Sequence, residues 1–100
     1  MIKKKLDSKK IIKEIEENSE DIRKFGVKKI GLFGSFLKRN NKKKNDVDIL
    51  VSFDEVSFDN YIRLKFLLEK LFGKKVDLVI EKNLRAELDY VKKEAEYARL

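Results

Sequence analysis

The sequence contains no cysteine, histidine, proline or tryptophan, and these absences exclude several kinds of chemistry. Without cysteine there is neither a disulfide framework nor a zinc–thiolate site. Without histidine, catalysis by Ser-His or Cys-His pairs is excluded, and so is metal binding through imidazole. A metal ion could be bound only through oxygen ligands, which favours Mg²⁺ or Mn²⁺.

Long apolar runs are also missing, so no segment is expected to cross a membrane. The basic N-terminal residues are not followed by the apolar core of a signal peptide, and we expect a cytoplasmic protein. The length of 100 residues predicts one domain over 1–100. The net charge of +7 indicates an acidic partner such as a nucleotide, a nucleic acid or an acidic protein surface, although solubility explains the same charge equally well.

Hydrophobic periodicity predicts alternating helices and strands along the chain. Apolar residues at helical spacing predict helices over 7–26, 57–73 and 84–100. Short apolar runs rich in valine and isoleucine predict strands over 27–33, 46–53 and 74–80. A turn with a short helix over 34–39 and a loop over 40–45 connect the first two strands. This order is typical of a small α+β protein with α/β layers, in which helices pack on a mixed sheet.

Three aspartates interrupt the predicted strands. Asp46 and Asp48 flank a valine in the second strand, and Asp77 lies in the third. Side chains alternate between the faces of a strand, so Asp46 and Asp48 share one face, with Cα atoms about 6–7 Å apart. A single acid at a strand end is commonly just solvated, but two carboxylates this close repel each other unless a cation lies between them. If the strand of Asp77 is adjacent, three carboxylates converge, which suits two metal ions about 3.5–4 Å apart.

A Gly-Ser pair directly follows the first predicted strand. Gly34 has no Cβ, so the backbone can approach a ligand closely. Ser35 offers a hydroxyl and a backbone N–H at the expected start of a helix, where anions bind readily. Lys38 and Arg39 follow and could neutralise phosphate charge. Such turns are common, but in front of paired acids this one predicts a phosphate site.

The segment GSFLKRNNKKKNDVD contains Gly-Ser, ten residues and then Asp-x-Asp. This pattern resembles the signature of the DNA polymerase β-like nucleotidyltransferases. The chain as a whole is similar to the minimal nucleotidyltransferases, which occur as the antitoxin of a HEPN-domain toxin. The resemblance implies a polymerase β-like nucleotidyltransferase fold, ATP as substrate and two Mg²⁺ ions, with Mn²⁺ as the alternative. It also implies a hetero-oligomer with the toxin and transfer of AMP to a toxin tyrosine, which silences the toxin's RNase activity.

The resemblance further implies roles for individual residues. Gly34 and Ser35 would hold the triphosphate. Asp46 and Asp48 would ligate both metal ions, and Asp77 would ligate one of them and help deprotonate the acceptor hydroxyl.

The chain departs from the family after the Gly-Ser pair. The family often reads Gly-Ser-aromatic-Ala-Arg-Gly, whereas Leu37, Lys38 and Arg39 occupy the last three places here. Lys38 keeps the positive charge without the bidentate fork of arginine. Arg39 in place of glycine changes the turn.

Three other functions are compatible with the sequence. The chain could neutralise its toxin by binding with little catalysis, or it could be a nucleotidyltransferase for a small molecule such as an aminoglycoside. The latter enzymes usually need further protein mass to enclose their acceptor. A basic nucleic-acid-binding module is the last alternative, although nucleic acid is not the expected direct substrate.

Overall fold

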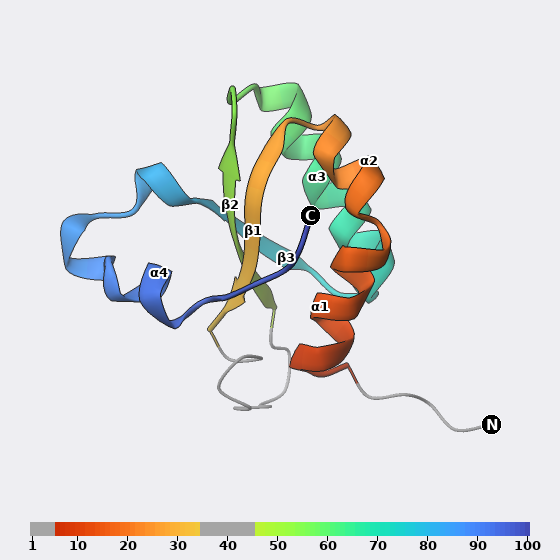
Figure 1. Cartoon of the computed structure of the whole chain (residues 1–100), viewed down its shortest axis with the longest axis horizontal. Helices are drawn as coiled ribbons and strands as arrows, with labels where there is room; N and C mark the ends of the chain where they lie inside the picture. Colours follow the sequence, from red (N-terminus) through yellow and green to blue (C-terminus); the bar gives the residue numbers. More distant parts are fainter. Residues whose placement is uncertain (1–5, 35–45) are drawn as a thin grey trace.

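The computed structural model describes residues 6–34 and 46–100 (Figure 1). The predicted short helix after Gly34 and the loop over 40–45 therefore lie outside the described residues. The described elements are, in order, α1 (Ser8–Glu17), α2 (Ser19–Lys24), β1 (Val27–Phe33), β2 (Val47–Phe53), α3 (Phe58–Phe72), β3 (Val76–Ile80), the 3₁₀ turns η1 (Glu81–Asn83) and η2 (Ala86–Leu88), α4 (Tyr90–Glu94) and β4 (Glu96–Tyr97).

The four strands form one mixed sheet in the order β3-β2-β1-β4. β1 pairs antiparallel with both β2 and β4, whereas β2 and β3 are parallel. The helices α1, α2 and α3 lie on one side of this sheet, and the segment from η1 to α4 extends to the other side (Figure 1). The predicted fold class, a small mixed sheet with helices packed on it, is confirmed.

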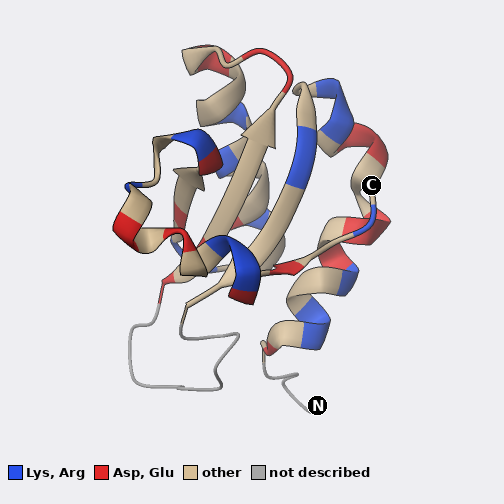
Figure 2. Ribbon diagram, turned by 60° about the vertical axis from the view of Figure 1, so that its left-hand side comes forward, with Lys and Arg blue, Asp and Glu red and all other residues tan. Residues whose placement is uncertain are grey.

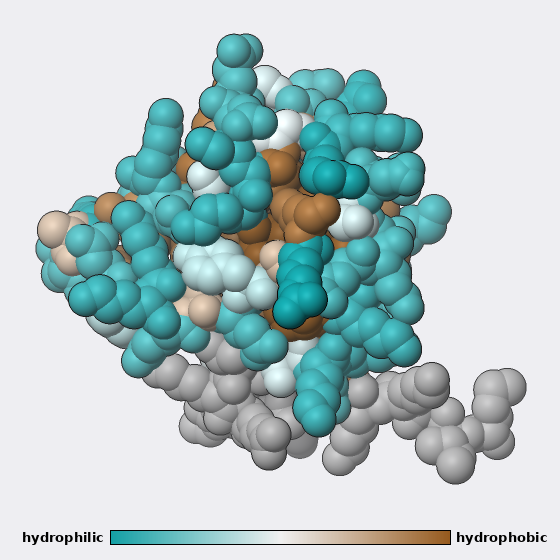
Figure 3. Space-filling model, in the orientation of Figure 1, coloured by the Kyte–Doolittle hydropathy of each residue, from teal (hydrophilic) through white to brown (hydrophobic). Residues whose placement is uncertain are grey.

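The core lies between the sheet and the N-terminal helices and α3. All of these elements contribute fully buried side chains to it: Ile11, Ile15, Ile22, Ile30, Leu32, Val47, Ile49, Val51, Leu64 and Leu68. Burying one aliphatic side chain of this size contributes about 1.5–3 kcal/mol, so this layer stabilises the packing of the helices on the sheet. The surface seen in Figure 3 is mostly hydrophilic, with hydrophobic side chains visible near its middle.

Polar residues set the ends of the helices. The Asp7 carboxylate accepts a hydrogen bond of 2.9 Å from the Lys10 backbone N–H and caps α1. The predicted helix over 7–26 is divided in two at Asn18, whose side-chain amide donates to the Glu14 carbonyl at 2.8 Å. Asparagine competes for backbone hydrogen bonds in this way, which explains the break. Ser57 caps α3, and Gly73 ends it with φ +66°.

The predicted helix over 84–100 is wrong. This segment contains a 3₁₀ turn, the five-residue α4 and then β4, which pairs with β1. The edge of β1 offers backbone hydrogen bonds, and the Ala98 N–H donates to the Ile30 carbonyl at 2.9 Å. Gly31 leaves room for this pairing, since a Cβ there would lie 2.9 Å from Cδ1 of Tyr97. Tertiary pairing thus overrides the local helical pattern.

No helix in residues 6–34 and 46–100 combines the length and the apolar character needed to cross a lipid bilayer.

Candidate active site

Two of the three predicted acids lie side by side in the sheet. Asp48 and Asp77 are Cα partners in the parallel strands β2 and β3, so their side chains project from the same face about 4.8 Å apart along the hydrogen-bonding direction. Asp77 is exposed and Asp48 is half-buried. Asp46 is exposed and precedes β2 directly. The strands of Asp48 and Asp77 are therefore neighbours, which was the condition for the predicted acidic site.

Gly34 lies directly against Asp48. Phe33, the last residue of β1, is opposite Asp48 in the antiparallel register, and Gly34 follows with φ +79°. A Cβ on Gly34 would lie 2.8 Å from Cγ of Asp48, too close for any larger residue. The backbone that is predicted to approach a phosphate is thus adjacent to the predicted metal ligands. Ser35, Lys38 and Arg39 lie outside the described residues.

The donor set at this end of the sheet fits a hard cation. Carboxylate oxygens from neighbouring strands suit Mg²⁺, which keeps several waters and completes its shell with substrate phosphates. Within residues 6–34 and 46–100, no three acidic side chains are close enough to enclose a metal ion by themselves. The metal-binding roles of Asp46, Asp48 and Asp77 therefore stay predictions, with Asp48 and Asp77 as the adjacent pair.

The positive charge of the chain is concentrated beside this site in the sequence. Eight of the 25 basic residues lie in segments 1–5 and 35–45, which contain no acid, so the other 17 are balanced by 18 acidic residues. Figure 2 shows both signs interspersed along the described elements. Segment 35–45 connects Gly34 to Asp46 and carries five of these eight cations. This distribution favours a local anion such as a triphosphate over a broad nucleic-acid surface.

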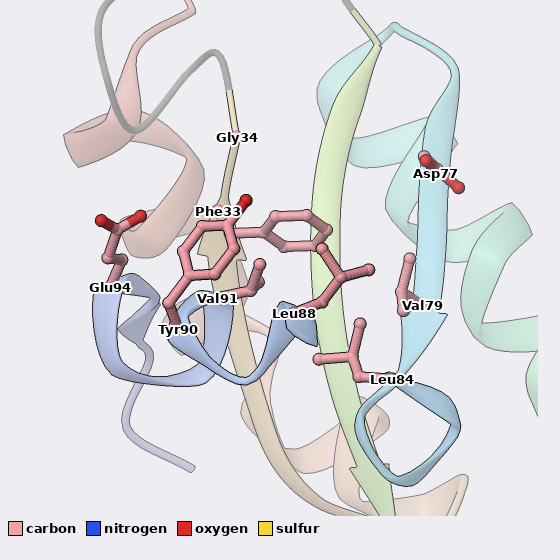
Figure 4. A pocket seen from close by; sticks show the side chains of 9 residues that line it. All are labelled: Phe33, Gly34, Asp77, Val79, Leu84, Leu88, Tyr90, Val91 and Glu94. Carbon is pink, nitrogen blue, oxygen red and sulfur yellow. The ribbon is translucent and has the colours of Figure 1, made fainter. Parts of the chain in front are cut away.

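A pocket of about 450 Å³ adjoins the acids on the face of the sheet opposite α1 and α3 (Figure 4). Its lining combines sheet residues with the segment after β3: Phe33, Gly34, Asp77, Val79, Leu84, Leu88, Tyr90, Val91 and Glu94. Most of these side chains are apolar, and a pocket of this size accommodates a small organic ligand or an aromatic side chain. Sequence reasoning missed this pocket, because the residues that form its outer wall were assigned to a continuous helix.

Tyr97 of β4 connects the sheet to the segment from η1 to α4, which forms the outer wall of the pocket. Its hydroxyl donates a 2.8 Å hydrogen bond to Oε2 of Glu81, the first residue of η1. Lys29 of β1 lies 3.8 Å from the same carboxylate oxygen and 4.7 Å from the centre of the Tyr97 ring. Burial, followed by the hydrogen bond and the negative charge of Glu81, raises the pKa of Tyr97 to about 12.

Tyr97→Phe is expected to lower the free energy of unfolding by about 1 kcal/mol at neutral pH, because the hydrogen bond from the Tyr97 hydroxyl to Glu81 is lost while the ion pair of Glu81 with Lys29 remains. The native protein retains the Tyr97 proton to a higher pH than the unfolded chain, whose pKa is near the ordinary value of 10.0. Its stabilising contribution is therefore complete below pH 10 and is lost as the pH rises toward 12. Urea unfolding across this pH range should show that the free energy of unfolding falls more steeply with pH for the natural sequence than for Tyr97→Phe. Parallel pH profiles would contradict the raised pKa of Tyr97.

Comparison with known proteins places the chain in a family. A family model described as a nucleotidyltransferase domain matches residues 8–100. The protein adenylyltransferase MntA of Thermococcus cleftensis is 45% identical over 64 residues, which are 63% of this chain and 65% of that protein. A protein of Methanocaldococcus jannaschii, provisionally named a protein adenylyltransferase, is 42% identical over 90 residues, covering 85% of this chain and 88% of its own length.

Solved structures agree with this placement. A protein provisionally described as a minimal nucleotidyltransferase matches with a TM-score of 0.79 and 29% identity, covering 94% of this chain and 98% of its own. The fold also occurs in a complex of an MNT antitoxin with a tri-AMPylated HEPN toxin from Shewanella oneidensis, with a TM-score of 0.59 and 20% identity over 86% of this chain and 70% of that one. The family match over 93 residues confirms the resemblance seen in the Gly-Ser and Asp-x-Asp motif: the chain belongs to the nucleotidyltransferase domain family.

Proposed function

We propose that the chain is a metal-dependent protein adenylyltransferase that transfers AMP from ATP to a tyrosine hydroxyl of a HEPN-domain toxin and thereby acts as its antitoxin. The observation that carries the proposal is the adjacency of Asp48 and Asp77 in parallel strands, with the backbone of Gly34 against Asp48. The names of the related protein adenylyltransferases support the reaction, and the antitoxin–toxin complex with the same fold supports the partner. Because ATP is the substrate, we place the protein in the cytoplasm.

The proposed reaction is a displacement at the α-phosphorus of ATP. The acceptor oxygen forms a bond to phosphorus, the bond from that phosphorus to the bridging oxygen breaks, and pyrophosphate leaves. The phenolic proton passes to the carboxylate of Asp77, which lines the pocket at the acidic end. Gly34 and Ser35 would hold the triphosphate, with Lys38 and Arg39 neutralising its charge. Mg²⁺, when bound to Asp46, Asp48 and Asp77, supplies charge neutralisation and alignment of the phosphates.

The function is tested by mixing the chain with its cognate HEPN-domain protein, ATP and Mg²⁺ and weighing both proteins by intact mass spectrometry. We expect AMP increments on the HEPN protein, and their loss when Mg²⁺ is removed with EDTA. A stable complex without any increment would replace the enzyme by a protein that neutralises its toxin through binding alone.

A further inference from the structure

The three tyrosine hydroxyls of the chain have different surroundings. Tyr61 donates a 2.6 Å hydrogen bond to the Leu78 carbonyl, which fixes it between α3 and β3. Tyr97 donates to Glu81, and its raised pKa makes the phenolate form hard to reach. Tyr90 is 53% exposed, and its hydroxyl has no hydrogen-bond partner in residues 6–34 and 46–100. Tyr90 is therefore the tyrosine whose oxygen is available to react.

Tyr90 also lies where the reaction is proposed to occur. It lines the same pocket as Gly34 and Asp77. In Figure 4 its ring extends from α4 over the pocket, and its hydroxyl points toward the end of β1 at which Gly34 lies. An acceptor that is part of the chain needs no encounter with a partner, and such proximity strongly accelerates a displacement.

We propose that the chain transfers AMP from a bound nucleoside triphosphate to its own Tyr90, an inference that rests on the proposed nucleotide chemistry of the site. The Tyr90 oxygen forms the new bond to the α-phosphorus. The bond between that phosphorus and the oxygen that bridges to the β-phosphate breaks, and pyrophosphate leaves with the electron pair. The phenolic proton passes to the Asp77 carboxylate on the opposite wall of the pocket.

The test uses the purified full chain alone with ATP and Mg²⁺. Intact mass spectrometry should show one AMP increment, and peptide mapping should locate it on Tyr90. The fraction modified per unit time should be unchanged over a tenfold range of chain concentration, because the acceptor and the site belong to one molecule. An increment at another residue, or a rate that rises with chain concentration, would overturn the proposal.

A parallel reaction with the HEPN-domain protein separates this inference from the proposed function. If the partner is modified while the chain alone stays unmodified, self-transfer is refuted and the proposed function stands. If neither protein is modified, both self-transfer and the proposed function are refuted. If only the chain is modified, self-transfer stands and the partner is not the acceptor.

Substitutions identify the acceptor oxygen. Tyr90→Phe keeps the ring and removes only the hydroxyl, so it should reduce the increment at least tenfold with an unchanged thermal unfolding midpoint, since that hydroxyl has no partner among the described residues. Tyr61→Phe is the matched control and should retain the increment, because Tyr61 lies between α3 and β3, donates to the Leu78 carbonyl and does not line the pocket. Persistence of the increment in Tyr90→Phe would refute the assignment.

Discussion

Asp48→Asn is expected to reduce AMP transfer by about 10³-fold or more while leaving the fold intact. Asparagine keeps the size of the side chain but removes the negative charge that would face a metal ion beside Asp77. Because the shape of the side chain is unchanged, the variant is expected to remain folded, with a cooperative urea unfolding transition. Initial rates of AMP incorporation and urea unfolding curves measure the two effects.

Asp54→Asn is the matched control for this experiment. Asp54 follows the opposite end of the same strand, is exposed, and is held through its backbone N–H, which donates to the Gly26 carbonyl at 2.8 Å. This variant should keep full transfer. Full transfer by Asp48→Asn would show that the acidic site has been assigned wrongly.

Gly34→Ala should lower transfer about 10²-fold, because the new methyl group would collide with the Asp48 carboxylate and displace it. The backbone at Gly34 has φ +79°, which any residue with a Cβ adopts at a cost of about 1 kcal/mol. The variant is therefore expected to be less stable as well as less active. The two effects are measured by thermal unfolding and by the rate of AMP incorporation.

Gly73→Ala is the control that separates the loss of stability in Gly34→Ala from its loss of activity. Gly73 has a similar positive φ of +66°, but no heavy atom lies within 4 Å of a Cβ built there. Its variant should show the same loss of about 1 kcal/mol with normal transfer. If both variants lose activity equally, the loss arises from reduced stability and not from contact with Asp48.

Local patterns in the sequence were sufficient for most of the fold. The strands that contain Leu32, Ile49 and Leu78 were recognised from short apolar runs, and α3 from its period and its caps. The structure of the C-terminal segment could not be recognised in this way, because it depends on residues far away in the sequence. Tyr97 pairs with Gly31, which lies more than sixty residues earlier in the sequence. No local pattern indicates that the edge of β1 is available for this pairing.

The site was predictable in its chemistry but not in its full shape. The alternation of side chains placed Asp46 and Asp48 on one face, the motif suggested the role of Gly34, and the resemblance to the family suggested that of Asp77. The pocket next to them depends on the path of residues 81–94 and on the contact of Tyr97 with Glu81, which are properties of the folded chain. The roles of Ser35, Lys38 and Arg39 stay predictions.

The pairing of β2 with β3 has a consequence for misfolding. Asp48 faces Asp77 only in the observed register, in which Ile49 is also opposite Leu78. A shift of one residue would exchange the two faces of β3 and turn Asp77 inward among aliphatic side chains, where an unpaired charge is penalised. The acid proposed to serve the reaction therefore also favours the correct strand register, because a sheet paired one residue out of register would bury its charge.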